Sequence, residues 1–232
     1  MSWIIWLVVL LAALVVTGWV LRKIGRLFAL VVMLCLAAAI IVAGAWVLID
    51  SNDLSQHFYQ DDKLVLLDID TRVAGAFVLG ESKIPRPIGD MAGIIRAYPD
   101  LSKIKGNYYK VIVMDWSVVE GNISIPGFKA TGREIRSAMV SGKPRDLLIK
   151  KSSEALGGGL LADITAQAIA MYPSEEMFAS SMFAILAAEP LSNPDKMLKG
   201  MKEGKVIVYP ETIVFKTIKF LPLDLARLLV PS

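Results

Sequence analysis

Two long apolar runs open the chain, and a short basic segment separates them. The runs cover residues 3–21 and 27–49, and neither contains a charged side chain. A helix needs roughly 20 apolar residues to cross the hydrocarbon core of a bilayer. Both runs reach that length, and a small soluble domain has little room to bury so much unbroken apolar surface. The pattern therefore predicts a transmembrane helical hairpin over residues 1–49.

The remainder of the chain is patterned like a soluble domain. Residues 50–62 are polar and predict a juxtamembrane linker or short helix, and the domain follows over 63–232. Runs of branched and aromatic residues predict strands at 63–70 and 72–80, with one or two more within 108–125. The two prolines within 82–90 predict a loop there, because proline cannot donate to a strand ladder.

Helix start patterns dominate the middle of this domain. Asp90 is placed to cap a helix that ends near Ala97. Thr131 and Glu134 have the spacing of a capping box, which predicts a helix to about Val140. Further start and stop patterns predict helices at 144–156, 160–172, 174–188 and 193–204.

The chain returns to a strand pattern near its end. Residues 205–209 and 212–220 predict a hairpin, and a short amphipathic helix follows over 222–230. Strands at both ends with a central helical block indicate an α+β domain with a mixed sheet. The predicted fold class is therefore a membrane-anchored α+β protein.

The basic residues between the two apolar runs predict the orientation. Arg22, Lys23 and Arg26 occupy this loop, and lysine and arginine are retained on the cytoplasmic side of a membrane. We therefore expect a multi-pass cell-membrane protein with a cytoplasmic loop and with residues 50–232 outside the cytoplasm. The rest of the chain has equal numbers of basic and acidic residues, so the net charge of +3 belongs to the loop. The composition gives no indication of a nucleic-acid partner.

The apolar runs leave two alternatives open. The small residues Ala43, Gly44 and Ala45 follow a basic and an apolar segment, as in a cleaved signal peptide, but a whole apolar run precedes them. Retained anchors are therefore favoured. Small residues four apart, Ala13 with Thr17 and 39 with 43, allow close helix packing, so a protein partner or self-association through the hairpin is expected besides the lipid bilayer.

Few residue types that carry catalysis or metal binding are present. The sole cysteine, Cys35, lies within the second apolar run, and the sole histidine is His57 in the juxtamembrane segment. A structural zinc site needs four such ligands. The sequence therefore predicts no metal and no cofactor.

One strand end resembles that of the haloacid-dehalogenase-type phosphatases. In that family an apolar strand ends in two aspartates one residue apart, the first a nucleophile and the second an acid/base. Asp68 and Asp70 match this pattern, and the segment ending at Ser117 is similar to the second motif of the family. Arg72 stands where the family has threonine or valine, and the downstream lysine with paired acids is missing. An exposed strand-end turn is the favoured interpretation.

A serine with a desolvated lysine is the remaining route to hydrolysis without histidine. Many serines and lysines follow the apolar runs, but no pattern pairs one of each. The serines considered are Ser117, Ser124, Ser137 and Ser141.

A local excess of basic residues predicts a patch for an anionic partner. It comprises Lys129, Arg133, Arg136, Lys143, Arg145, Lys150 and Lys151. Such a run can bind lipid headgroups or an acidic protein, and it can equally be a solvated helix face. Methionines at 171, 177, 182, 197 and 201 fill a core or line an adaptable partner groove.

These patterns together favour a non-enzymatic role. We expect a subunit, scaffold or binding module of a membrane complex. The alternative is a membrane-anchored hydrolase of the Ser-Lys type that acts outside the cytoplasm.

Overall fold

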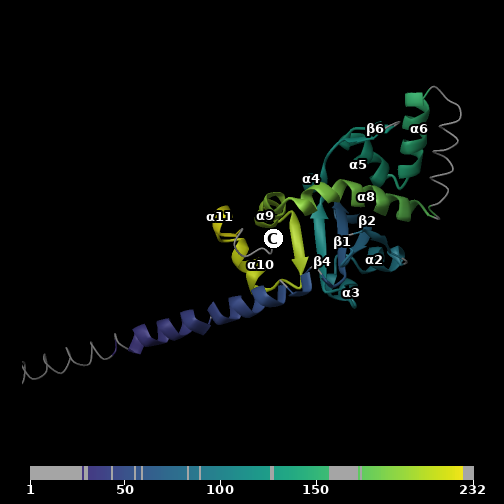
Figure 1. Ribbon diagram of the computed structural model, residues 1–232. Coiled ribbons are helices and arrows are strands. Elements are labelled where there is room, and N and C mark those ends of the chain that lie inside the picture. Colours follow the sequence, from purple (N-terminus) through teal and green to yellow (C-terminus); the bar gives the residue numbers. More distant parts are fainter. Residues whose placement is uncertain are drawn as a thin grey trace, which may run out of the picture. The chain divides into compact units, whose positions relative to one another are not determined.

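The computed structural model describes residues 28, 31–42, 44–54, 56–58, 60–82, 84–88, 90–125, 128–156, 172 and 174–226. The chain divides into two compact units, Met1–Ile49 and Asp50–Ser232 (Figure 1). The predicted apolar run at 3–21, the basic loop and most of the predicted helix at 160–172 lie outside the described residues.

An apolar helix dominates the described part of the first unit. A helix over Val31–Phe58 has a mean hydropathy of 2.8 in its most apolar stretch, and that stretch is not buried within the protein. It is the one helix among the described residues that is long and apolar enough to cross a membrane, by length and composition alone. The two-helix hairpin stays a prediction.

The second unit is built on a mixed sheet, as the sequence predicts. The five-stranded sheet has the order β3-β2-β1-β4-β7. Strand β1 is parallel to β4, and the other neighbours are antiparallel. Its strands are β1 (Lys63–Ile69), β2 (Arg72–Leu79), β3 (Arg86–Pro87), β4 (Lys110–Asp115) and β7 (Val206–Tyr209). Strands β5 (Ile123–Ile125) and β6 (Phe128–Ala130) pair separately.

Helices flank this sheet and begin at the predicted caps. Asp90 accepts from the Gly93 amide at 2.8 Å, and Thr131 with Glu134 forms the complete capping box. The helices are α2 (Met91–Ala97), α3 (Leu101–Lys105), α4 (Trp116–Val119), α5 (Gly132–Val140), α6 (Pro144–Leu156), α8 (Glu175–Ser192), α9 (Pro194–Lys202), α10 (Ile213–Ile218) and α11 (Leu223–Ala226).

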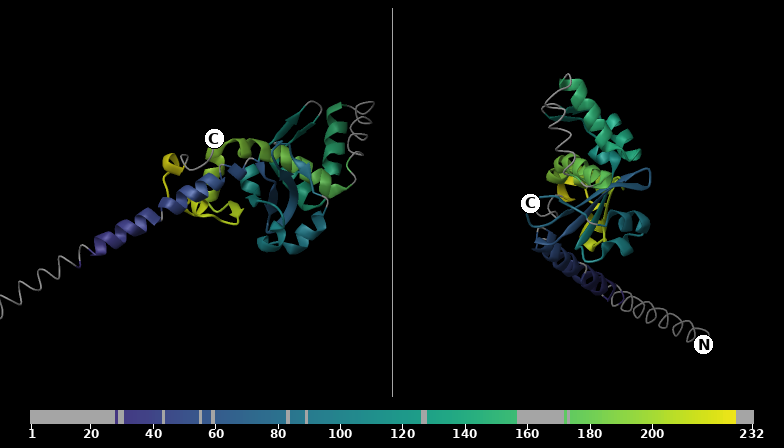
Figure 2. Two further views of the ribbon diagram at one scale, coloured as in Figure 1. Left: turned by 60° about the horizontal axis from the view of Figure 1, so that its bottom comes forward. Right: turned by 90° about the vertical axis from the view of Figure 1, so that its right-hand side faces the viewer.

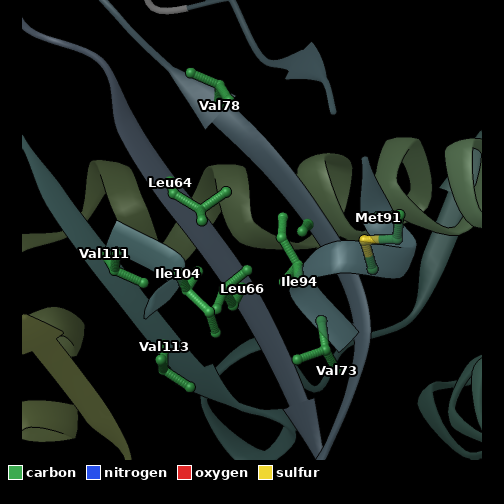
Figure 3. Close-up of a cluster of buried hydrophobic side chains, with 10 residues drawn as sticks. Leu64, Leu66, Val73, Val78, Met91, Ile94, Ile104, Val111 and Val113 are labelled. Carbon is green, nitrogen blue, oxygen red and sulfur yellow. The ribbon is translucent and has the colours of Figure 1, made fainter. Parts of the chain in front are cut away.

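The two faces of the sheet have different covers. Helices α2 and α3 cover one face, where Leu64 and Leu66 of β1 pack with Ile94 and Ile104 (Figure 3). Helix α8 covers the other face, and it runs between the sheet and helices α5 and α6 (Figure 2). The ring of Phe77 there lies 5.0 Å from that of Phe183. Strand β1 is consequently buried on both faces, which explains its unbroken apolar pattern.

The predicted terminal hairpin is wrong in its second strand. Residues 213–218 form helix α10, so β7 alone joins the sheet, beside β4. The buried side chains of α10 are Val214, Phe215 and Ile218, which share one face at helical spacing. Their β-branched and aromatic types favour strands, but the packing of this face decides the structure.

Three smaller predictions also need correction. Residues 116–119 form α4 and interrupt the strand run predicted within 108–125. Helix α3 was not predicted. Strand β3 forms within the predicted loop, because a proline is tolerated on an edge strand whose outer side needs no donor.

The predicted linker at 50–62 is helical over most of its length and is packed into the second unit. Leu54 is 2% exposed. The Asp53 carboxylate accepts a hydrogen bond from the Tyr109 hydroxyl at 2.8 Å. Residues that directly follow the apolar segment therefore form part of the domain.

Candidate functional site

Two carboxylates lie side by side where the parallel strands β1 and β4 end. Asp68 and Asp115 are in register on these strands. Neighbouring strands are about 4.8 Å apart, so both side chains project from the same face at that spacing. One Asp68 oxygen accepts from the Tyr98 hydroxyl at 2.7 Å. Its other oxygen, Oδ1, is buried without a hydrogen-bond partner among the described residues.

The Tyr98 hydroxyl is held neutral in this setting. Burial raises its pKa, and the hydrogen bond to Asp68 and the charges of Asp68 and Asp115 raise it further. Asp115 caps helix α4. Its carboxylate accepts hydrogen bonds from the amide of Ser117 at 2.8 Å and from the hydroxyl of Ser117 at 2.5 Å. No cluster of three metal-ligating side chains occurs within the described ranges. The pair therefore has acceptor oxygens to spare, among them the buried Asp68 Oδ1, but it does not form a three-ligand cluster for a metal within the described residues.

The resemblance to the phosphatases does not extend to geometry. Asp70 and Thr71 form a two-residue hairpin loop, both with positive φ, 53° and 64°. Both oxygens of Asp70 accept from Arg136 at 2.7 Å. Asp68 turns instead to Tyr98, and it is half-buried rather than exposed. The two aspartates do not meet at one reaction centre.

Two lysines are buried among the described residues of the second unit, and both donate to backbone carbonyls. Lys63 and Lys110 are in register at the opposite ends of β1 and β4 from the aspartates. Burial lowers the pKa of both amines. Lys63 donates to the carbonyl of Asp61 at 2.8 Å, and Lys110 donates to that of Pro210 at 3.1 Å.

None of the four serines that could act with a lysine in hydrolysis is seen beside a buried lysine among the described contacts. The Ser117 hydroxyl donates to Asp115, and the Ser141 hydroxyl donates to the carbonyl of Ala138 at 3.0 Å. Ser137 is exposed, and the side chain of Ser124 lies outside the described part. Among the described contacts, none joins one of these hydroxyls to Lys63 or Lys110.

Intramolecular ion pairs engage more than half of the predicted anionic-partner patch. Arg136 binds Asp70, and Lys151 lies 2.7 Å from Glu134. The Glu134 carboxylate accepts hydrogen bonds from Lys151 and from the amide and hydroxyl of Thr131. These three bonds lower the pKa of Glu134 to about 2. The other pairs are Arg145 with Glu175 at 3.7 Å, Lys150 with Glu154 at 4.0 Å and Lys151 with Glu154 at 3.5 Å.

The other three residues of that patch, Lys129, Arg133 and Lys143, are exposed. Arg133 borders a cavity of 510 Å³ between the loop after α4 and the start of α5. The Gly132 amide at this helix start already donates to the Asn122 side chain at 3.0 Å. Binding of an anionic partner here stays a prediction.

A second cavity, of 420 Å³, lies between α2, β3 and the first half of α8. This volume falls within the range of about 300–1,000 Å³ typical of ligand sites. We call it the α2–α8 groove. It is lined by Pro87, Ile88, Asp90, Met91, Ala92, Ile95, Ser174, Glu176, Met177 and Ser180.

The polar side chains of the α2–α8 groove are already used to support the fold. The Ser180 hydroxyl accepts from the Ala76 amide at 3.2 Å and donates to the Glu176 carbonyl at 2.7 Å. Ser174 caps α8 by accepting from the Met177 amide at 3.2 Å. Asp90 caps α2. The groove therefore presents mainly apolar surface to a ligand, with the carboxylates of Asp90 and Glu176 as its charged groups.

The sequence indicated only part of this groove. Met177 belongs to the methionines for which an adaptable groove was considered. No sequence pattern marked Ile88, Ile95 or Ser180 as part of a groove. The groove forms only when residues 87–95 and 174–180, which are far apart in the sequence, come together in the fold.

No family model, curated protein or solved structure matches this chain. The fold itself defines a mixed α+β domain that follows an apolar helix. Folds of this kind carry many unrelated functions, so a functional argument has to come from the site.

Proposed function

We propose that this protein is a membrane-anchored, non-enzymatic binding module. Its apolar N-terminal segment anchors it in a bilayer, and its α+β domain binds a partner protein through the α2–α8 groove. The observation that carries the proposal is the groove itself, 420 Å³ in volume and lined mainly by apolar side chains. Of its polar residues, Asp90 and Ser174 cap helices and Ser180 binds the backbone of β2 and α8.

The anchoring rests on the apolar segment. The most apolar stretch of the helix over Val31–Phe58 is not buried within the described protein, and its hydropathy matches the hydrocarbon of a membrane. The run at 3–21 adds a second span in this proposal. The basic loop with Arg22, Lys23 and Arg26 lies in the cytoplasm, and the domain lies outside it. Small residues of the spans support self-association.

The surroundings of the groove indicate the chemistry of its occupant. Met91 and Met177 are flexible and polarizable, and they adapt to apolar side chains of different shape. The bond from its own amide lowers the pKa of Glu176, and the Ser174 hydroxyl and the charge of Arg145 lower it further. Glu176 is therefore anionic at neutral pH. The occupant that fits is an apolar side chain of a polypeptide with a basic residue beside it.

Site-specific crosslinking in intact membranes tests the groove. A photoreactive phenylalanine analogue replaces Ile95, which is 46% exposed and lines the groove. The matched control is Ile149 on α6, which is 47% exposed. We expect a protein adduct at position 95 and none at position 149, and we expect Ala92→Trp, which fills the groove, to abolish the adduct.

Equal adducts at both positions, or an adduct at position 95 that survives Ala92→Trp, would contradict the groove as the binding site. Circular dichroism of each variant checks that the domain stays folded.

A further inference from the structure

The turn between α10 and α11 exposes an unusual amount of apolar surface. Phe220 is 87% exposed, and Ile213 and Leu223 are exposed in part. The opposite face of α10 is buried in the domain. Lys202 donates to the carbonyl of Leu221 and supports the turn. Residues 213–223 therefore combine a buried apolar face of α10 with apolar side chains that are exposed at its first residue, in the turn after it and at the start of α11.

The chain itself indicates what covers this surface. The Asp50 carboxylate accepts a hydrogen bond from the Val214 amide, in the first turn of α10, at 2.7 Å. Asp50 is bonded directly to Ile49, the last residue of the apolar unit. If the apolar segment spans a bilayer, Asp50 emerges at its surface. The start of α10 is then within a hydrogen-bond length of a residue at that surface.

The charges beside the apolar side chains fit the same surroundings. Lys216 is exposed on α10, and Lys219 just after it is exposed and forms an ion pair with Glu211. Lysine stems lie along apolar surface while their amines reach the headgroups, and phenylalanine and leucine are common on the apolar face of segments that lie in this region. Short amphipathic segments of this kind lie about 5–10 Å into the boundary of headgroups and acyl chains.

We infer that the surface formed by Ile213, Lys216, Lys219, Phe220 and Leu223 lies in the headgroup region of the bilayer that holds the apolar segment. This inference rests on the proposed membrane anchoring. The contact gives the domain a second attachment to the bilayer, and it sets the face of the domain that is turned to the lipid.

Depth measurement by spin labelling tests the contact. The full-length chain with Cys35→Ala carries a nitroxide at Phe220→Cys, in vesicles of phosphatidylcholine and phosphatidylglycerol. The control label is at Ile84→Cys, which is 67% exposed between β2 and β3. Oxygen concentrates in lipid and a nickel chelate stays in water. We expect a several-fold lower ratio of nickel to oxygen accessibility at position 220 than at position 84.

Three results would overturn the inference, and they have different meanings. Equal ratios at the two positions, in protein that resists an alkaline carbonate wash, contradict the surface contact and leave the anchoring intact. Release by carbonate contradicts the anchoring and the contact together. Dipolar broadening at position 220 that disappears on dilution with unlabelled protein assigns the surface to a second copy of the chain.

A charge reversal tests the role of the basic residues. Lys216→Glu is expected to raise nickel accessibility at position 220 in these anionic vesicles, because the acidic side chain is repelled by the headgroups. Arg72→Glu, at the exposed first position of β2, is the control and leaves that accessibility unchanged. The same rise in both variants would contradict a specific contact of α10 with lipid.

Discussion

The carboxylate of Asp50 caps helix α10 by accepting the amide hydrogen of Val214, across 164 positions of the chain. Thr212 occupies the N-cap position of that helix, but its side chain makes no capping bond. Its hydroxyl is buried and has no partner among the described residues. A helix start normally finds its cap within the neighbouring sequence. Here the first residue after the apolar unit supplies it.

Loss of this cap is expected to destabilise the domain. Asp50→Ala should lower the free energy of unfolding by about 1 kcal/mol, the usual effect of removing an N-cap side chain. Asp50→Asn keeps an acceptor oxygen and should cost less. Thermal unfolding of the full-length protein in mild detergent measures both, with Glu81→Ala in the turn after β2 as control. Equal midpoints for Asp50→Ala and the control would show that the bond does not contribute.

Two substitutions of Lys110 should distinguish the contribution of its charge to stability from the contribution of its packing. Lys110→Met is expected to be neutral or stabilising, since an apolar group of similar volume removes a buried charge. Lys110→Ala should cost about 2–4 kcal/mol because it leaves a cavity. Urea unfolding of both variants measures this. If Lys110 were instead the base of a Ser-Lys hydrolase, both variants would lose turnover in a peptidase and esterase screen.

The same residue predicts a pH dependence at alkaline pH. Burial lowers the pKa of Lys110 below its ordinary 10.5, so the unfolded chain binds more protons than the folded one as pH approaches that value. Stability therefore rises with pH in this window. Lys110→Met should reduce the rise, and Lys63, whose pKa is also lowered by burial, should supply what remains. An unchanged slope in Lys110→Met would contradict a buried, charged amine.

Glu134 predicts a pH dependence of the opposite kind in acid. Its pKa of about 2 lies below the ordinary 4.5, so it stabilises the fold above pH 4.5 and loses that effect as pH falls toward 2. Glu134→Gln should be less stable than the unaltered protein at pH 6, and the difference should close at low pH. Unfolding midpoints across this range measure it. A constant difference at every pH would assign the effect to packing rather than charge.

Tyr98→Phe tests the polar contact at the end of β1. The change leaves the half-buried Asp68 without the one side-chain donor that it has among the described residues, which should cost about 1–3 kcal/mol of stability. In Asp68→Asn/Tyr98→Phe the combined cost should be smaller than the sum of the two single costs, because the residues share one bond. Tyr108→Phe is the control. Additive costs would show that the two side chains stabilise the fold independently.

Local patterns located many elements of the second unit. The capping box of Thr131 and Glu134, and the caps Asp90 and Ser174, begin their helices as predicted, since each bond joins residues three positions apart. The strands at 63–70 and 72–80 were also predicted, because the loop between them holds only two residues and the strands pair as a hairpin. These structures depend on neighbours in the sequence.

The α2–α8 groove, the register of Asp68 with Asp115 and the cap from Asp50 to Val214 could not be predicted in this way. Each joins segments that are distant in the chain, and their meeting depends on how helices and strands bury their apolar faces together. Residues 213–218 show the same limit, since strand-favouring side chains form α10 once one face packs on the domain.

The sequence by itself therefore determined the apolar N-terminal pattern and the helix starts, because short-range hydrogen bonds and hydropathy need no distant partner. The tertiary structure alone decided which polar groups meet and where an apolar surface stays open. The physical reason is that packing and desolvation act on residues brought together in space.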